Sequence, residues 1–259
     1  MASQDLNHET ASNDEIAAYC SNADHASLSE ACYDIHVVKL SEDAVVKFGL
    51  NVKEEEATSL RRADELIDQD IVRIPIAYRF FIKAQQGYIV MEHMHGRVLQ
   101  PVEEPVMVRR IADILAYLTT ICGSVPGPLG GGVSCGILWS EHSEEPLLHS
   151  FEEMEDWFNR GLREQDHKLR FGESVLVLCH LDLAPRSFLL LEDGSVCLLD
   201  WASAGFCPRV FEECAIRVAH GLKDSFDEDA LKLKDLSEKE EVQISSMMQA
   251  YYNTVRYHS

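Results

Sequence analysis

The chain has 259 residues and carries 44 Asp and Glu against 23 Lys and Arg, a formal net charge of −21. A field of that sign opposes nucleic acids and anionic membranes, so we expect neither as a partner. The length is enough for a sizeable core in one large domain or two coupled lobes, and the sequence has neither a transmembrane run nor an apolar leader, which predicts a cytoplasmic protein.

The first segment, residues 1–30, is rich in Ser, Asn, Asp, Glu and Ala and has little apolar surface to bury, which indicates a flexible arm. Two strands joined by a Ser-Glu-Asp turn are predicted at 36–40 and 44–48. Lys47 lies within the second strand, among apolar residues. Taken alone, it is best interpreted as a solvated strand lysine.

A helix is predicted over residues 52–68, because apolar residues recur there at helical spacing. This apolar stripe consists of Leu60, Ala63 and Ile67. One turn earlier the stripe reaches Glu56, so this carboxylate should face inward. A buried carboxylate needs a counter-ion, and we predict that Lys47 supplies it in an ion pair between strand and helix.

The middle of the chain combines core elements with one long loop. An extended piece, an apolar strand and a core helix are expected at 74–78, 87–92 and 106–122. Residues 123–136 are rich in Gly and Pro, but no Gly-Lys-Ser/Thr follows, so they are not a P-loop. A place beside a binding pocket and a plain surface loop both remain open for this segment. Further helices are predicted at 150–165, 211–222 and 237–257.

The most informative segment runs from Cys179 to Trp201. An apolar strand leads to His180 and Asp182, and two apolar runs then flank an Asp-Gly turn, which predicts a hairpin that ends at Asp200. Two carboxylates beside buried strands are costly unless they have a function. Phosphoryl transfer uses one carboxylate beside the acceptor hydroxyl and another to hold Mg²⁺ on the nucleotide phosphates.

This segment resembles the catalytic segment of the aminoglycoside phosphotransferase and choline kinase family. The similar positions are His180, Asp182, Pro185 and Asp200-Trp201, and the wording Ala184-Pro185-Arg186 resembles fungal members. The resemblance covers about residues 35–220. It implies an α+β, two-lobed, protein-kinase-like fold, with a small lobe of one antiparallel sheet and one helix at 31–92 and a mainly helical lobe at 93–259 that carries the catalytic loop.

The same resemblance implies ATP and Mg²⁺ as cofactors and a hydroxyl group of a small molecule as the acceptor, in a monomer or homodimer. Asp182 would position and deprotonate the acceptor, and His180 would brace its loop by hydrogen bonding. Asp200 would hold Mg²⁺. Ser187 stands where the family has an Asn that binds a second Mg²⁺, so it would be a shorter and weaker ligand.

In the small lobe, the resemblance implies that Lys47, oriented by Glu56, contacts the nucleotide phosphates. Glu92 would be the first residue of the hinge segment that faces adenine. One feature departs from the pattern, because the chain has no glycine before Gly49 and therefore no glycine-rich loop over the phosphates.

Two functions therefore remain open. The first is an ATP- and Mg²⁺-dependent small-molecule kinase, which we prefer because four charged groups stand at matching positions: Lys47, Glu56, Asp182 and Asp200. The alternative is a repurposed kinase fold without phosphotransfer, which binds or shapes (for example cyclises) an apolar metabolite between the lobes. Ser187 and the absence of the glycine-rich loop motivate this alternative.

Overall fold

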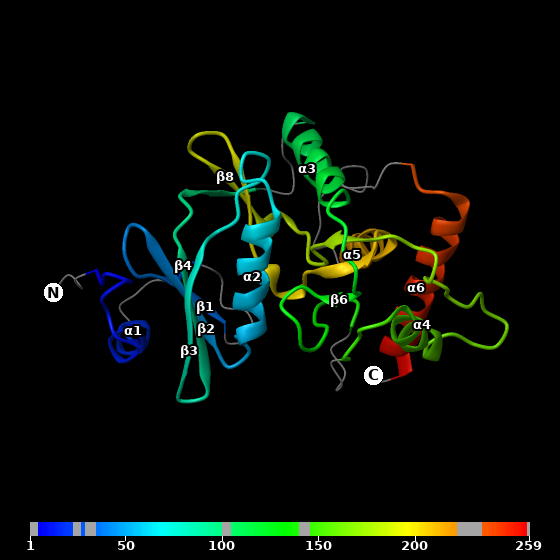
Figure 1. Cartoon of the computed structure of the whole chain (residues 1–259), viewed down its shortest axis with the longest axis horizontal. Coiled ribbons are helices and arrows are strands. Elements are labelled where there is room, and N and C mark those ends of the chain that lie inside the picture. The colour runs from blue at the N-terminus through cyan, green and yellow to red at the C-terminus, as the bar shows by residue number, and fades with distance from the viewer. Residues whose placement is uncertain are drawn as a thin grey trace.

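The computed structural model describes residues 5–22, 27–28, 35–99, 105–139, 146–221 and 235–257. The chain forms a small lobe on one side and a larger, mainly helical lobe on the other (Figure 1). The small lobe is built on a four-stranded antiparallel sheet in the order β1-β2-β4-β3. Its strands are β1 (His36–Lys39), β2 (Ala44–Gly49), β3 (Ala77–Lys83) and β4 (Gln86–Glu92).

The third strand of the sheet extends well beyond the piece that the sequence predicts. The extended piece expected at 74–78 continues as β3, which pairs with β4 across a tight turn at Ala84 and Gln85. Both turn residues have positive φ, 49° and 67°, a conformation that non-glycine residues rarely adopt. Nothing in the residue types of this turn signals that conformation, so the sequence pattern did not predict the hairpin or the full length of β3.

The outer face of the sheet is covered by helix α1 (Asn13–Cys20). Ser12 and Glu15 form a reciprocal capping box at its start. Its inner face buries the apolar residues Ile16, Ala17 and Cys20. For this stretch the structure differs from the flexible arm expected over 1–30, because a few small apolar side chains at helical spacing suffice to dock one short helix.

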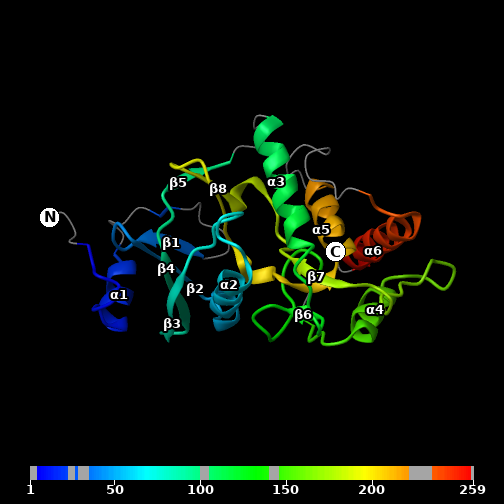
Figure 2. The same cartoon turned by 45° about the horizontal axis from the view of Figure 1, so that its top comes forward.

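Helix α2 (Glu54–Leu66) covers the opposite side of the sheet and lies between the two lobes (Figure 2). The predicted apolar stripe is buried there, at Leu60, Ala63 and Ile67. Leu60 and Ala63 belong to a core cluster that also takes in the larger lobe. The helix therefore connects the sheet to the larger lobe through shared apolar packing.

The larger lobe contains four helices among its described residues: α3 (Pro105–Leu118), α4 (Phe151–Arg160), α5 (Val210–Gly221) and α6 (Glu238–Tyr257). Each overlaps a predicted helix, with ends that differ by a few residues. Ser150 caps α4 as its sequence indicated. Within the described part of the chain, no helix has the length and apolar character needed to cross a membrane.

Two small antiparallel sheets carry the segments of interest. One has the order β6-β10-β7, from β6 (Gly127–Pro128), β10 (Gly205–Pro208) and β7 (Leu176–Cys179). The other has the order β5-β8-β9, from β5 (Gly96–Val98), β8 (Phe188–Leu191) and β9 (Val196–Leu198). The predicted hairpin is β8–β9, with Phe188 opposite Leu198.

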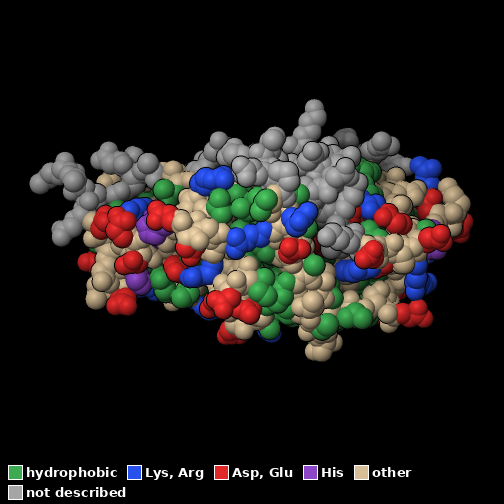
Figure 3. Space-filling view, turned by 90° about the horizontal axis from the view of Figure 1, so that it is seen from above, with side chains coloured by type: hydrophobic (Ala, Val, Ile, Leu, Met, Phe, Trp, Pro, Cys, Tyr) green, Lys and Arg blue, Asp and Glu red, His purple; other side chains and the backbone are tan. Residues whose placement is uncertain are grey.

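One core cluster spans the lobes and fixes the hairpin against helices α2 and α3. Phe188 and Trp201 are almost fully buried in it, together with Leu118. Truncating a buried aromatic to alanine typically costs about 3–5 kcal/mol. On the surface, the face seen in Figure 3 mixes acidic and basic side chains instead of gathering one sign.

Candidate active site

The site begins at Lys47, which points from the central strand β2 toward α2 and is buried. Its Nζ lies 2.5 Å from Glu56 Oε1 and 2.9 Å from Asp200 Oδ1. The ion pair predicted between Lys47 and Glu56 is confirmed. The structure adds Asp200 from the larger lobe as a second carboxylate on the same ammonium group.

The three charges shift one another's protonation. Burial alone would lower the pKa of Lys47, but the carboxylates of Asp200 and Glu56 outweigh it and raise that pKa, so the ammonium stays charged. Lys47 in turn lowers the pKa of Asp200. For Glu56, burial raises the pKa and the attraction of Lys47 offsets only part of that rise.

Asp200 is the member of this group that faces solvent. Its side chain is 40% exposed, whereas that of Glu56 is 12% exposed. One lysine shared by two carboxylates leaves a negative charge uncompensated when both are ionised. The open face of Asp200 is therefore where a cation from solvent can be held.

The backbone at Asp200 is held in the left-handed region, with φ 65° and ψ 62°. That conformation costs free energy for a residue with a Cβ and persists only where the surroundings enforce it. Here Trp201, buried and donating from Nε1 to the carbonyl of Leu198 at 2.9 Å, anchors the following turn. Such strained residues cluster at functional sites, which supports a functional reading of Asp200.

His180 joins the two loops that carry the carboxylates. Its Nε2 is 2.9 Å from the carbonyl of Leu199, and its Nδ1 accepts from the amide of Asp182 at 3.3 Å. The ring is fully buried and packs edge-on against Trp201. Burial lowers the pKa of His180 to about 4, so the ring is neutral, with its proton on Nε2.

Ser187 makes a second connection between the same loops. Its Oγ donates to the carbonyl of Asp182 at 2.9 Å, and its own carbonyl accepts from the amide of Leu199 at 2.8 Å. A hydroxyl has a single proton, and Ser187 uses it on this carbonyl. Its lone pairs are what remain for a cation. The side chain itself is buried.

The Asp182 carboxylate has a partner that the sequence analysis missed. Arg186 Nη2 donates to Asp182 Oδ1 at 2.8 Å. The two side chains are 50% and 31% exposed, so this ion pair lies at the solvent boundary. An i,i+4 spacing of opposite charges signals a pair on a helix. Here Arg186 lies within a single turn at 185–187 and Asp182 precedes that turn, so the helix rule makes no prediction.

The loop that carries His180 and Leu181 is held in place by Glu212 on α5. Its buried carboxylate accepts hydrogen bonds from the amides of His180 and Leu181. Burial raises the pKa of Glu212 to about 7, although the two amides favour its charged form. Leu181 also has a positive φ of 66°, so both loops contain a strained non-glycine residue.

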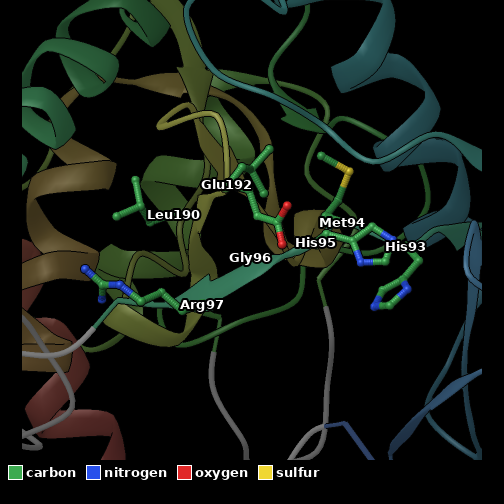
Figure 4. Close-up of a pocket in the computed structure, with 8 residues that line it drawn as sticks. His93, Met94, His95, Gly96, Arg97, Leu190 and Glu192 are labelled. Carbon is green, nitrogen blue, oxygen red and sulfur yellow. The ribbon is translucent and has the colours of Figure 1, made fainter.

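Glu92, the first residue of the expected hinge, is occupied by neighbouring segments of the chain. Its carboxylate accepts from the amide of Ile76 at 3.2 Å and lies 3.9 Å from Arg73. A surface pocket adjoins this segment, formed by 93–97 and 190–192. Figure 4 shows Glu192 facing the histidine end of the pocket and Arg97 at the other end. The rings of His93 and His95 both contact the carbonyl of Glu42.

The Gly/Pro segment is neither a free surface loop nor a P-loop. It packs against α2, one residue before Glu56: a Cβ on Gly130 would meet the carbonyl oxygen of Glu55 at 2.0 Å. Gly132 lies against the Glu55 side chain with a φ of 74°. Glycine is needed here because two backbones approach closely. The loop thereby buttresses the helix turn that carries Glu56.

The donor set is compatible with a nucleotide-borne Mg²⁺ and not with a resident metal cage. In the part of the chain that the structure describes, no three His, Cys, Asp or Glu residues are grouped to hold a metal. Mg²⁺ characteristically uses one or two protein carboxylates and takes its other ligands from phosphates and water. Asp200, whose side chain is 40% exposed, fits that pattern, and Ser187 is linked to the same segment through the amide of Leu199.

No protein-family model matches the chain, and no curated protein does. Its fold is nevertheless that of known kinases. The aminoglycoside phosphotransferase APH(4)-Ia, in a ternary complex with AMP-PNP and hygromycin B, aligns with a TM-score of 0.53 at 13% identity over 92% of this chain and 87% of that one. The apo form of a thermostable mutant of that enzyme gives a TM-score of 0.55 at 14% identity, over 92% of this chain and 88% of that one. APH(2")-IIia with GDP and kanamycin gives 0.53 at 14% identity, over 90% and 85%.

These matches show the fold, a mixed α+β, protein-kinase-like architecture shared with aminoglycoside phosphotransferases. They extend beyond the segment on which the sequence resemblance rested, about residues 35–220. At 13–14% identity they carry no information about the substrate of this chain.

Proposed function

We propose that this protein is an ATP- and Mg²⁺-dependent phosphotransferase that acts on a hydroxyl group of a small molecule. The observation that supports it most is the Lys47 ammonium held between Glu56 and Asp200, across the boundary of the lobes. A site with one fixed cation and one solvent-open carboxylate suits phosphates that arrive with a metal ion. The protein would work in the cytoplasm as a monomer or homodimer.

Lys47 would bind phosphate oxygens of the nucleotide. Because its pKa is raised, it remains protonated across the physiological range and can neutralise phosphate charge. Glu56 would hold the ammonium group in place beside Asp200, since its carboxylate is 2.5 Å from Nζ. Pre-positioned charge of this kind needs no reorganisation during the reaction.

Asp200 and, more weakly, Ser187 would hold Mg²⁺. When bound, the ion supplies charge neutralisation for the transferring phosphoryl group. Lys47 already lowers the pKa of Asp200, so the carboxylate is ionised and ready to bind a cation at neutral pH. The strained backbone at this residue, anchored by Trp201, would fix the direction of the carboxylate.

Asp182 would accept a hydrogen bond from the acceptor hydroxyl and take its proton as the oxygen attacks the γ-phosphorus. The P–O bond to ADP breaks as the new P–O bond forms, and ADP leaves with the electron pair. His180 is buried and neutral, so it would position the Asp182 amide and not exchange protons with the acceptor.

The test is nucleotide binding followed by turnover. Thermal unfolding would be measured with ATP, with Mg²⁺ and with both, because a ligand that binds the folded state raises the melting temperature by mass action. The pair together should stabilise more than either alone, and Asp200→Ala should abolish that synergy. ATP consumption with a panel of hydroxylated compounds would follow, with Asp182→Ala as the blank. No stabilisation by any combination would overturn the proposal.

A second function has one observation in its favour. The Ser187 hydroxyl donates its only proton to the Asp182 carbonyl, so it is a weaker second metal ligand. A weakened metal site is consistent with a kinase fold that no longer transfers phosphate. Such a protein would bind or shape an apolar metabolite between the lobes. ATP and Mg²⁺ would then leave the melting temperature unchanged, while an apolar ligand would raise it.

A further inference from the structure

Arg186 contacts the Asp182 carboxylate directly, with its Nη2 2.8 Å from Asp182 Oδ1. It lies on the turn 185–187, and its guanidinium is half exposed. Exposed ion pairs contribute about 0–1 kcal/mol, because water competes for both partners. The pair can therefore be exchanged for another partner at little cost.

The position of this guanidinium affects the whole site. Arg186 directly precedes Ser187, whose carbonyl accepts from the amide of Leu199 at 2.8 Å, so the turn that carries Arg186 adjoins the segment that leads to Asp200. A molecule that reaches Asp182 from solvent meets Arg186 at the same time, because the two exposed side chains are in contact at 2.8 Å.

The chemistry of guanidinium then restricts the acceptor. A polycation would bring like charge against Arg186, whereas a carboxylate or phosphate would form a two-pronged, charge-assisted pair with it. Such a pair would also draw Arg186 away from Asp182 and free the oxygen that must receive the hydroxyl proton. The overall charge of −21 gives no such preference, because a net charge does not place a field at one site, and on the face seen in Figure 3 acidic and basic side chains are mixed.

We propose that Arg186 binds an anionic group of the acceptor, so that the protein selects hydroxyl compounds that carry a carboxylate or phosphate and disfavours polycations. The inference rests on the proposed phosphotransfer at Asp182. It separates this chain from structurally similar enzymes solved with hygromycin B or kanamycin.

The first experiment measures binding and does not require turnover. Melting temperatures would be compared for two matched sets of compounds. One set is glycerol, D-glycerate and glycerol 3-phosphate, and the other is glucose, gluconate and glucose 6-phosphate. Kanamycin represents the polycations. The anionic members should stabilise the wild type, and Arg186→Gln should weaken their apparent affinity at least tenfold. Arg170→Gln, which removes a more exposed arginine (73% against 50% for Arg186) that is paired with Glu155 elsewhere, should change nothing.

The second experiment measures ATP consumption with the same compounds. Arg186→Gln should raise KM for anionic acceptors at least tenfold, with a smaller change in kcat. The KM of Arg186→Lys should lie between those of the wild type and Arg186→Gln, because lysine keeps the charge but cannot form the two parallel hydrogen bonds of a guanidinium. Comparison of carboxylate and phosphate members identifies which anion is preferred.

The outcomes separate this inference from the proposed function. Turnover of neutral or cationic acceptors with no advantage for anionic ones would overturn the role of Arg186 and leave phosphotransfer standing. Anion binding that depends on Arg186, in a protein that does not bind ATP, would support the role of Arg186 and overturn the proposed phosphotransfer. A wild type that none of the anionic compounds stabilises, or an Arg186→Gln protein that binds them equally well, would also overturn the inference.

Discussion

Lys47 Nζ lies 2.9 Å from Asp200 Oδ1, a contact that joins residues 153 positions apart in the chain. It connects the central strand of the small lobe with the end of the β8–β9 hairpin in the larger lobe. The ammonium group is also the counter-ion of Glu56, so one cation serves the packing of α2 and the geometry of the site together. Changes at Lys47 should consequently affect both stability and nucleotide binding.

Replacing Lys47 with Met should destabilise the protein by about 3–5 kcal/mol, because it leaves the buried Glu56 carboxylate without its counter-ion. Adding Glu56→Gln to that variant should restore much of the loss, since the uncompensated charge is then gone. Urea unfolding of the wild type, both single variants and the double variant gives the coupling energy. Equal stabilities of wild type and Lys47→Met would show that the Lys47–Glu56 pair does not contribute to the free energy of unfolding.

Ser187→Asn should preserve or raise ATP turnover and tighten Mg²⁺ binding. A carboxamide can donate from its nitrogen to the Asp182 carbonyl and still present its oxygen to the ion, whereas the serine hydroxyl has one proton for both tasks. Ser187→Ala should lower turnover, but less than Asp200→Ala, which removes a charged ligand. Turnover and the Mg²⁺ dependence of the rate are the measurements. A loss of Mg²⁺ affinity in Ser187→Asn, in a folded protein, would contradict the ligand role.

His180 should make stability fall in acid. Its folded pKa of about 4 lies below the ordinary 6.5, so its contribution is full above pH 6.5 and is lost as the pH falls through about 4. The loss amounts to roughly 3 kcal/mol. His180→Gln cannot titrate, so the stability difference between wild type and variant should shrink from pH 7 to pH 4. Parallel curves would rule out a buried neutral histidine.

That comparison must be made between variants, because Glu212 acts in the opposite direction. Its folded pKa of about 7 exceeds the ordinary 4.5, so its contribution is present below pH 4.5 and is lost as the pH rises through about 7. The pH dependence of the wild type alone therefore mixes two opposed effects. Glu212 is present in both the wild type and His180→Gln, so its effect cancels in the stability difference between them.

Gly130→Ala should destabilise the protein by about 1–3 kcal/mol, because the new Cβ would lie 2.0 Å from the Glu55 carbonyl oxygen and force the loop and α2 apart. Gly172→Ala is the matched control, since its Cβ would meet nothing within 4 Å. Thermal unfolding of the two variants decides the matter. If both behave alike, the close approach of the loop to α2 is not a structural requirement.

Much of the site was predictable from local patterns in the sequence. The apolar stripe of α2 pointed Glu56 inward toward Lys47, and the Asp-Gly turn predicted the β8–β9 hairpin, in which Phe188 lies opposite Leu198. These inferences held because a helix repeats every few residues and a tight turn brings its flanks together, whatever the rest of the chain does. The roles of these residues in phosphotransfer stay predictions.

Other features depended on contacts that no local pattern encodes. The Lys47–Asp200 pair requires the lobes to be docked, and docking is set by a core shared between α2, α3 and the hairpin. The Arg186–Asp182 pair depends on the dihedral angles of one short turn, and the Gly130 contact on how closely two backbones approach. Packing free energy over many residues decided these positions, so only the tertiary structure revealed that Asp182 has a cationic partner.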